Sequence, residues 1–537
     1  MWLGLFLVIC FAGCVRIRLL DLPLERDEGE YAYMGRLMLE GTAPFKLAYS
    51  MKLPGTSAMY ALIMAVFGQT TVGIHLGLLV LNAATIGLVF LLGRKLIDDK
   101  AGFIAAASYA ILSLHPSVMG IVAHATNFVI FFALAGMLML LRAMETRRIS
   151  VYFLSGVLLG LGFVMKQPGL FFVLFGLLFL IRMEWKQGAV NRTGFAARIA
   201  SFSIGAALPF ALICIWLWRA GVFRRFWFWT FTYATNYGSR QTPGQGWQNL
   251  EFHVESEMGW DILFWLVAAV GMFFLWRDKA ARFNAIFLTT LLLISIVAVG
   301  QGLYFRPHYF ILALPAVCLL IGGGYESARC WLAKTKALAV WQFAPAAIFA
   351  AVGALVVLGE APLFFEYPAT RASEYLYATY GPNPFPTSGM IAGFVRDHTQ
   401  AGDTMAVLGS EPQIYFQSQR KSATGYLYTY SLMEPGPLAR PMQSEMMVEI
   451  EAAKPEIIVL AKLTFSWGIT PQSDGTILAW AQKYCADNYE VVGVLSYPVK
   501  SAADIHWEAD AARHMADSKE SIYVFKRKPA SPAAPNP

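Results

Sequence analysis

Charged side chains are scarce in this sequence. Only 14% of the 537 residues are Asp, Glu, Lys or Arg, whereas 57% are hydrophobic. Soluble domains carry about 25% charge, so the composition excludes an ordinary soluble enzyme. The 14% of aromatic residues exclude a disordered chain, and the 45 glycines have no period that would indicate a collagen-like fibre. A protein that crosses a membrane several times remains, with enough length for a second, soluble domain.

Cysteine and the usual metal-binding spacings are also scarce. Five of the six cysteines lie in or beside apolar segments, so they do not form a disulfide framework. The sequence has no His-x-x-x-His or Cys-x-x-Cys spacing, and Gly322 to Gly324 are not followed by Lys-Ser or Lys-Thr. A metal site is therefore poorly supported by the sequence, which leaves a metal requirement open, and we expect no cofactor and no phosphate loop for a nucleotide.

Apolar segments of suitable length occur along the first two thirds of the chain. A bilayer core needs about 20 apolar residues in a helix, although shorter segments can be tilted or re-entrant. Eleven candidate spans result: 2–20, 71–92, 101–115, 117–141, 151–165, 168–181, 199–218, 260–276, 283–300, 308–324 and 338–358.

The loop charges predict the orientation of these spans. With a cytoplasmic N-terminus, 16 Lys and Arg residues fall in five short cytoplasmic loops, as the positive-inside rule requires. An odd number of spans then places the C-terminal region outside the cytoplasm. Arg16 and Arg18, at the outer end of the first span, conflict with the rule. A cleaved signal is an alternative for the N-terminus, where Cys14 follows Phe-Ala-Gly, but the positive region that opens a signal peptide is missing.

The last third of the chain has another character. Residues 371–537 contain 14 basic and 17 acidic residues, which leaves a net charge of +10 on the preceding 370 residues. A basic membrane portion suits lipid phosphates, and nothing indicates a nucleic-acid partner. Apolar runs at 404–408, 456–460, 491–496 and 521–525 alternate with helical patterns at 390–398, 443–453 and 476–485. The pattern predicts an extracytoplasmic α/β domain over 371–528 with a mostly parallel sheet, after a membrane domain over 1–360, and a disordered tail over 529–537.

Charge is concentrated in the external loop 21–70. Residues 26–36 read Arg-Asp-Glu-Gly-Glu-Tyr-Ala-Tyr-Met-Gly-Arg, and Met51-Lys52-Leu53-Pro54-Gly55 follows before an interfacial helix. Charged groups held between apolar spans are costly, so a functional site is the default hypothesis. A structural role is the alternative, because Asp27 and Glu30 have the spacing of a capping box for a helix that Gly41 would end.

These motifs resemble the lipid-linked-sugar glycosyltransferases of the GT-C superfamily. The similarity is greatest to bacterial relatives of the protein O-mannosyltransferases and of the aminoarabinose transferase that modifies lipid A. It rests on Asp27-Glu28, on Lys52-Leu53-Pro54-Gly55, on Gly160 to Gly169 and on Phe305-Arg306-Pro307-His308-Tyr309-Phe310. These motifs cover about the first 325 residues in the expected order.

The resemblance implies a sugar on a polyprenyl phosphate as donor and a lipid, glycan or protein acceptor, outside a bacterial inner membrane. A phosphate leaving group needs cations, and the acceptor hydroxyl needs one base, so a single inverting displacement fits these residues. Asp27 is the candidate base, and Glu28 would orient it or bind the acceptor. The candidates for binding the donor are Lys52 first, then Arg36, Lys166, Arg306, His308 and His124.

Each of these candidates has a structural alternative. Lys166 could be a snorkelling anchor, Arg306 and His308 could cap a helix, and Arg36 could pair with Glu40. Many members of the superfamily carry a second acidic residue near the start of the fourth span, where this chain has His124 and Asn127. One of these two would have to replace that residue, or its role is missing here.

Two other classes of function remain open on the sequence. A transporter of the lipid-linked sugar is disfavoured, because transporters usually have internal repeats and ionisable residues near the middle of their spans. A membrane-anchored binding or assembly protein, with the α/β domain as its working part, is neither supported nor excluded.

Overall fold

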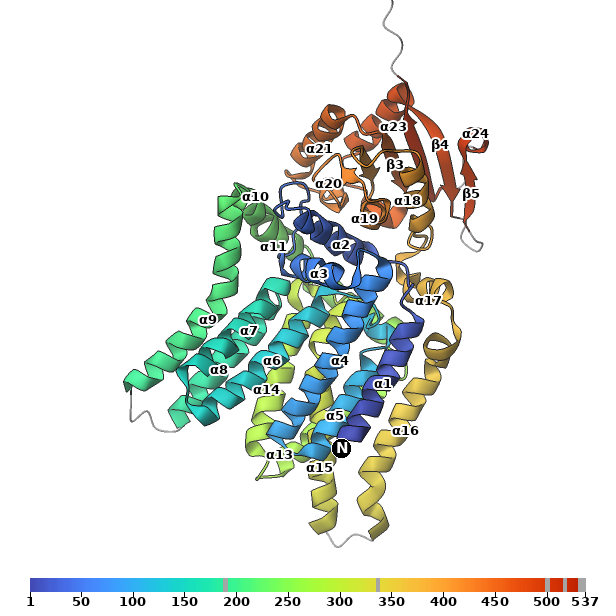
Figure 1. The fold of residues 1–537 in the computed structure, drawn as a ribbon. Helices are drawn as coiled ribbons and strands as arrows, with labels where there is room; N and C mark the ends of the chain where they lie inside the picture. The colour runs from blue at the N-terminus through green and yellow to red at the C-terminus, as the bar shows by residue number, and fades with distance from the viewer. Residues whose placement is uncertain (187–191, 335–338, 498–502, 515–518, 530–537) are drawn as a thin grey trace, which may run out of the picture. The chain divides into compact units, whose positions relative to one another are not determined.

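The structure is a computed structural model that describes residues 1–186, 192–334, 339–497, 503–514 and 519–529 (Figure 1). It divides into two compact units, which are described separately. The first comprises Met1–Asp21, Met51–Met59 and Val66–Ala372, and the second comprises Leu22–Ser50, Tyr60–Ala65 and Ser373–Pro537. The tail expected to be disordered lies, apart from Pro529, outside the described residues.

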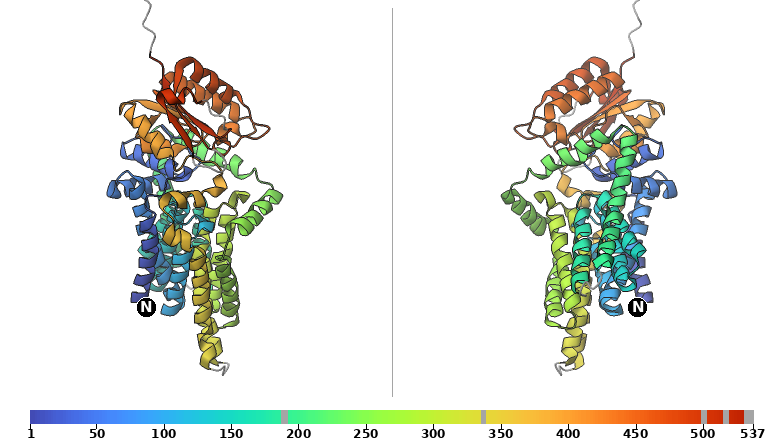
Figure 2. Two further views of the ribbon diagram at one scale, coloured as in Figure 1. Left: turned by 90° about the vertical axis from the view of Figure 1, so that its right-hand side faces the viewer. Right: turned by 90° about the vertical axis from the view of Figure 1, so that its left-hand side faces the viewer.

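The first unit is a bundle of apolar helices, most of which run side by side (Figures 1 and 2). The longer helices are α1 (Trp2–Arg18), α4 (Thr71–Leu96), α5 (Asp99–Leu112), α6 (Ala125–Thr146), α7 (Ile149–Met165), α8 (Gly169–Lys186), α9 (Arg192–Arg219), α13 (Ile262–Arg277), α14 (Arg282–Val299), α15 (Leu314–Lys334) and α16 (Ala344–Gly359). Short helices connect α9 to α13: α10 (Phe223–Trp227), the π-helix Phe228–Tyr233, α11 (Ala234–Gly238), α12 (Pro243–Phe252) and the π-helix His253–Glu257.

The structure does not confirm the predicted number of eleven membrane spans. Within the described residues, five helices are long and apolar enough to cross a membrane, and a sixth span results if α12 with its π-helix and α13, bent by 112°, count as one. Two predicted spans also begin later than expected. The chain forms a 3₁₀ turn at Pro116–Val118 before α6 and another at Pro307–Leu312 before α15. Both turns begin with proline, which is tolerated at the first position of a helical turn.

Arg16 and Arg18 have a structural explanation for their unusual position. The guanidinium of Arg16 donates hydrogen bonds to the carbonyl oxygens of Ser113 and Gly120, at 2.9 Å each. Arg18 donates to the carbonyl oxygens of Phe364, at 2.9 Å, and Tyr367, at 2.6 Å. Carbonyls outside regular helices need donors when they are buried, so these two arginines supply hydrogen bonds between segments.

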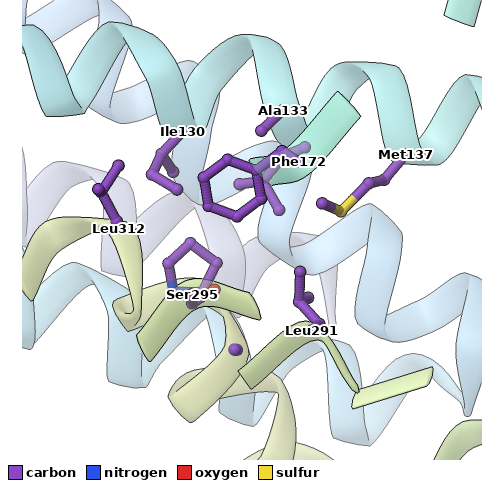
Figure 3. A pocket seen from close by; sticks show the side chains of 10 residues that line it. Ile130, Ala133, Met137, Phe172, Leu291, Ser295 and Leu312 are labelled. Carbon is purple, nitrogen blue, oxygen red and sulfur yellow. The ribbon is translucent and has the colours of Figure 1, made fainter. Parts of the chain in front are cut away.

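The interior of the bundle is closely packed. Between α6, α8, α14 and the turn before α15 lies one small apolar cavity of about 10 Å³, about the room that one water molecule needs. Figure 3 shows Ile130, Ala133, Met137, Phe172 and Leu291 around it. Such a space does not accommodate a sugar or a lipid chain.

The second unit contains a six-stranded sheet in the order β2-β1-β3-β6-β4-β5. Its strands are β1 (Thr404–Leu408), β2 (Lys421–Ser422), β3 (Ile457–Lys462), β4 (Tyr489–Ser496), β5 (Asp504–Trp507) and β6 (Ser521–Arg527). Its helices are α18 (Ser388–Asp397), α19 (Pro412–Ser418), α20 (Tyr430–Met433), α21 (Ala439–Ala453), α22 (Thr464–Trp467), α23 (Thr476–Asn488) and α24 (Glu508–Ala511), and α17 (Ala369–Leu376) leads into the unit.

The sheet is mixed, so the prediction of a mostly parallel sheet is wrong. β1 pairs in parallel with β2 and β3, whereas β6 is antiparallel to both β3 and β4, and β5 is antiparallel to β4. Seven residues separate β4 from β5. A parallel crossover needs a dozen or more residues, so this connection permits only an antiparallel pair.

Residues 22–50 belong to this second unit, although they follow the first apolar helix in the sequence. Their helix α2 (Arg26–Leu39) packs against α19. The contact is close at Gly29, where an added Cβ would lie 2.4 Å from the backbone nitrogen of Gln413. Arg26 forms a salt bridge of 2.7 Å with Glu411, and both side chains are buried. Loop 21–70 is therefore built largely into the α/β unit.

We expect the Arg26–Glu411 pair to be essential for the stability of the second unit. Breaking a buried ion pair leaves one charge uncompensated, so Glu411→Ala should lower the free energy of unfolding by about 3–5 kcal/mol. The exposed Lys421–Glu40 pair at 3.3 Å provides the control, because Lys421→Ala should cost less than about 1 kcal/mol. Thermal unfolding of the purified proteins would measure both, and equal midpoints for the two variants would contradict the expectation.

We also expect Gly55 to be intolerant of any side chain. An added Cβ would lie 2.3 Å from the carbonyl oxygen of Val164 at the end of α7, whereas at Gly87 in α4 it would meet nothing within 4 Å. Gly55→Ala should therefore lower the thermal unfolding midpoint by several degrees, since it forces apart two packed backbones. Gly87→Ala should leave the midpoint unchanged or raise it, and a similar fall in both would show that the contact is unimportant.

Candidate active site

Helix α2 begins two residues earlier than the predicted capping box requires. Its N-cap is Glu25, whose carboxylate accepts a hydrogen bond of 2.9 Å from the backbone nitrogen of Glu28. The carboxylate of Glu28 in turn accepts one of 3.4 Å from the nitrogen of Glu25. The capping box at Asp27 and Glu30 is therefore wrong, because the same acidic spacing occurs twice and the earlier pair caps the helix. The predicted end is confirmed, since α2 ends at Leu39 and Gly41 follows with a φ of +79°.

Asp27 lies in the first turn of α2 without capping it. Residues 24 to 37 are all buried except Asp27, which keeps part of its surface exposed. The hydroxyl of Tyr428 donates a hydrogen bond of 2.9 Å to Asp27 Oδ1. Burial, and then the negative charges of Asp27 and Glu30, raise the pKa of Tyr428 well above its usual value. Tyr428 therefore stays protonated and holds the Asp27 carboxylate in one orientation.

The neighbouring carboxyl groups are fully buried and have a different environment. Burial, followed by the negative charges of Asp27 and Glu28, raises the pKa of Glu25 well above the usual range for a glutamate. Glu25 therefore binds a proton more tightly than an exposed glutamate does. The carboxylate of Glu28 accepts a hydrogen bond from the backbone at the start of α2, so this side chain takes part in capping the helix.

Arg36 is also used inside the second unit. Its guanidinium donates to the carbonyl oxygens of Arg420 at 2.9 Å and of Tyr415 at 3.3 Å, and it lies 3.4 Å from Glu40. The structural alternative of an ion pair with Glu40 is therefore present. These contacts are with the α/β unit, whereas the other basic candidates lie in the first unit.

The segment around Lys52 packs against the end of α7. Thr56 Oγ1 donates to the carbonyl oxygen of Met165 at 2.9 Å, and Gln167 Nε2 donates to that of Met51 at 2.8 Å. The Lys52-Leu53-Pro54-Gly55 motif is thus held directly beside the Met165-Lys166-Gln167 motif. Two sequence features separated by more than 100 residues form one part of the structure.

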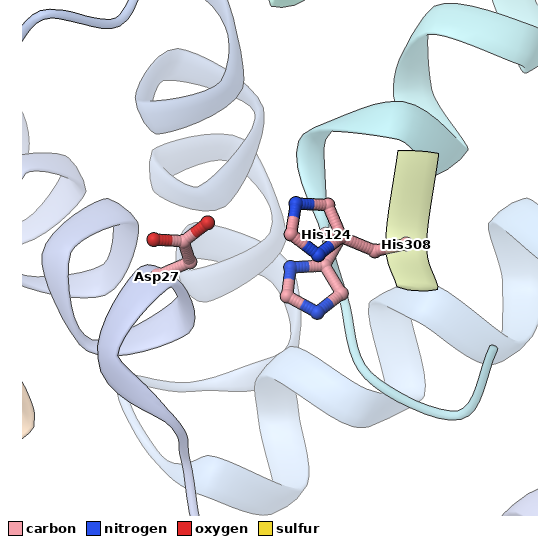
Figure 4. Close-up of side chains that lie close together, drawn as sticks. All are labelled: Asp27, His124 and His308. Carbon is pink, nitrogen blue, oxygen red and sulfur yellow. The ribbon is translucent and has the colours of Figure 1, made fainter. Parts of the chain in front are cut away.

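Two histidines lie next to this pair of motifs. The imidazole rings of His124 and His308 stack with centroids 4.0 Å apart and 16° between their planes, as Figure 4 shows. His124 precedes α6 and His308 lies in the turn before α15, and both are buried. Lys166 Nζ lies 4.2 Å from the ring centroid of Tyr309, next to His308. The face of an aromatic ring attracts a cation, so Tyr309 restrains the lysine.

The basic candidates of the first unit act on one another electrostatically. Burial lowers the pKa of His308 well below its usual value, and His124, Lys166, Lys52 and Arg306 lower it further. The lowered pKa keeps His308 neutral near pH 7. We call Lys52, Lys166, Arg306, His308 and His124 the basic cluster. Within the described residues, His308 Nδ1 is buried without a hydrogen-bond partner.

Asn127 does not present its amide to the basic cluster. Its Nδ2 donates to the carbonyl oxygens of Val122 at 3.2 Å and His124 at 3.4 Å, which closes the turn before α6. Of the two residues considered as replacements for a second acidic group, His124 is therefore the one whose ring contacts another site candidate.

Sequence reasoning missed Tyr428 and Tyr309. Tyr428 is 401 residues from Asp27, and no motif connects them. Tyr309 lies inside a quoted motif, but its contact with Lys166 depends on how α7 and the turn before α15 pack. Only the tertiary structure identifies these two contacts.

The first comparison with known proteins concerns the sequence. The family described as dolichyl-phosphate-mannose-protein mannosyltransferase matches residues 52–218. That range contains Lys52, His124 and Lys166 of the basic cluster. No curated protein matches the chain.

Solved structures match the chain over most of its length. ArnT from Cupriavidus metallidurans bound to undecaprenyl phosphate is 16% identical with a TM-score of 0.58, and the match covers 99% of each chain. The same protein in its apo state is 13% identical with a TM-score of 0.57, over 98% of this chain and 97% of that one. The oligosaccharyltransferase AglB from Archaeoglobus fulgidus, in complex with an inhibitory peptide and a dolichol-phosphate, is 13% identical with a TM-score of 0.50, over 94% of this chain and 74% of that one.

These identities are low, so the structural matches establish the fold. They and the family match agree with the resemblance that the sequence motifs carry. The chain has the fold of the GT-C membrane glycosyltransferases, and its predicted resemblance to them is confirmed.

Proposed function

We propose that this protein is an inverting glycosyltransferase that moves a sugar from a polyprenyl phosphate to an acceptor hydroxyl on the extracytoplasmic face of a bacterial inner membrane. The observation that carries the proposal is the basic cluster, in which the Lys52 and Lys166 motifs are packed together beside two stacked, buried histidines. A cluster of this charge suits a lipid-linked phosphate. ArnT, which has a similar fold, is bound to undecaprenyl phosphate, and this supports the choice of donor.

The basic cluster would stabilise the leaving group. In the displacement, the bond between the anomeric carbon and the phosphate oxygen breaks and that oxygen takes the electron pair. Lys52, Lys166 and Arg306 would compensate the added negative charge, which is the kind of electrostatic stabilisation that accelerates group transfer most. No acid is needed, because the departing phosphate is already a stable anion.

Asp27 would act as the base. The acceptor hydroxyl attacks the anomeric carbon from the side opposite the phosphate and loses its proton to the carboxylate. Partial exposure of Asp27 and its hydrogen bond with Tyr428 support this role, because the group is accessible and oriented. Glu28 would act indirectly, by holding the start of α2. Arg36 would likewise anchor α2.

The proposal also concerns the acceptor and the side of the membrane on which the reaction takes place. We propose a lipid, glycan or protein of the cell envelope as the acceptor, and a position outside the cytoplasm for the α/β unit. The charged residues of the site candidates lie at helix ends or in turns, and not in the middle of apolar helices. This position favours surface chemistry over transport.

The deciding experiment is transfer from a supplied polyprenyl-phosphate sugar by the purified protein. Asp27→Asn should lower turnover by about 10²–10⁴-fold, because the base is lost while the shape is kept. Asp21→Asn, an exposed carboxylate at the other end of the connection to α2, is the matched control and should have full activity. Undiminished turnover of Asp27→Asn would refute the assignment of the base.

The basic cluster has its own test. Lys52→Ala should weaken binding of a polyprenyl phosphate by about 10–100-fold, since a hydrogen bond to a charged group contributes about 1.5–3 kcal/mol. Lys46→Ala, which removes an exposed lysine from the same loop, should leave binding unchanged. If no donor is hydrolysed or transferred while labelled lipid crosses the membrane of proteoliposomes, the protein is a transporter.

The Tyr428 contact predicts a shift in the pH profile. A hydrogen bond to a carboxylate favours its ionised form, so losing it should move the acidic limb of the turnover profile to higher pH in Tyr428→Phe. A loss of about 1.5–3 kcal/mol corresponds to about one to two pH units. Tyr430→Phe is the control, because the hydroxyl of Tyr430 donates to the carbonyl oxygen of Phe465 at 2.9 Å. Superimposable profiles for wild type and Tyr428→Phe would contradict the positioning role.

A further inference from the structure

A group of potential metal ligands lies in the α/β unit, at the edge of the sheet. His506 is in the edge strand β5, Asp510 is in the short helix α24 that follows it, and His514 comes four residues later. The three residues are spaced by four positions each. Each offers one ligand atom within 4.8 Å of those of the other two.

The side chains already face one another. Asp510 Oδ2 lies 2.6 Å from His506 Nδ1, and Asp510 Oδ1 lies 3.2 Å from His514 Nδ1. The two imidazole rings stack with centroids 3.8 Å apart and 5° between their planes. One carboxylate is thus shared between two parallel imidazoles.

A fourth residue orients the first histidine. Asp504, at the start of β5, places Oδ2 3.0 Å from His506 Nε2. Histidines that bind a metal through one ring nitrogen usually donate the N–H of the other to a carboxylate. Asp504 has this relation to His506, while Nδ1 of the same ring points to the shared carboxylate.

We propose that His506, Asp510 and His514 bind one zinc ion, with Asp504 as the carboxylate that orients His506. Two imidazoles and one carboxylate are a ligand set that zinc accepts, and the fourth tetrahedral position is left for water. Ligand atoms on a tetrahedral zinc lie about 3.4 Å apart, given bonds of about 2.0–2.2 Å. The separations of 2.6 and 3.2 Å between Asp510 and the two histidines would have to open, and the imidazole rings would have to turn out of their stack. The side chains of Asp510 and His514 are half exposed, so they can adjust.

The ion would connect the edge strand to the segment after α24. β5 pairs with β4 alone, because it lies at the end of the sheet. An unpaired strand edge can associate with other chains. A bound zinc ion would restrain the end of β5. This role does not depend on the proposed transferase reaction.

Zinc binding can be measured on the full-length protein, purified with a tag that lacks histidine and freed of metal by a chelator. Titration with zinc chloride against a chromophoric competitor should show one equivalent fewer in His506→Ala and in His514→Ala than in wild type. Asp504→Asn should keep the equivalent and weaken it about 10–100-fold. His398→Ala is the matched control, because His398 also pairs with a carboxylate, Glu508, at 3.4 Å in the same unit. Equal stoichiometry and affinity in all variants would overturn the proposal.

A second measurement needs no variant and so does not depend on folding of the substituted proteins. Zinc should protect His506 and His514 from carbethoxylation of their imidazoles, read by mass spectrometry of wild type, and should leave His398 reactive. Unchanged modification of His506 and His514 at saturating zinc would overturn the proposal.

Discussion

The two buried arginines of α2 determine the position of the candidate base. Arg26, at the start of the helix, pairs with Glu411, and Arg36, near its end, donates to carbonyl oxygens of residues 415 to 420. Burying a guanidinium is unfavourable unless its charge and its N–H groups are matched, so each arginine permits few arrangements of the helix. The close approach at Gly29 adds a steric restriction. Asp27 is adjacent to Arg26, so its backbone position is fixed together with the helix. The hydroxyl of Tyr428 then orients the Asp27 carboxylate.

The basic cluster, in contrast, brings side chains of like charge close together. Its cations come from three separate segments, and bringing them together in a partly buried region is unfavourable without an anion. The pKa of His308 is lowered first by burial and then by the charges of the neighbouring basic residues. Close packing of residues 51–56 against the end of α7 and the contact of Lys166 with the ring of Tyr309 compensate for the repulsion. The phosphate site that we propose would therefore be preorganised, because its cations are held together before the ligand arrives.

Local patterns in the sequence predicted the regular elements well. The first apolar run of the tail became β1 over the same residues, Thr404–Leu408, and the helical pattern at 476–485 became α23 (Thr476–Asn488). Errors arose where the same stretch of sequence allows two different starts of a helix. Two overlapping acidic spacings could cap α2, and proline-initiated turns delayed α6 and α15. The strands β2 and β5 were missed because two and four residues carry too little periodicity, and β5 contains two residues of the proposed zinc site.

The sequence by itself determined that the chain is a membrane protein with a C-terminal α/β unit, because composition and hydrophobic periodicity are local properties. It also indicated the candidate residues Asp27, Lys52 and Lys166 through motifs of contiguous residues. Only the tertiary structure decided which side chains each candidate contacts within its own unit, since hydrogen bonds and charge interactions depend on distances in space. The Tyr428–Asp27 contact, the stacking of His124 on His308 and the use of Arg36 as an anchor each join residues that are far apart in the chain. Sequence spacing carries no information on such contacts, because they follow from the packing of whole elements.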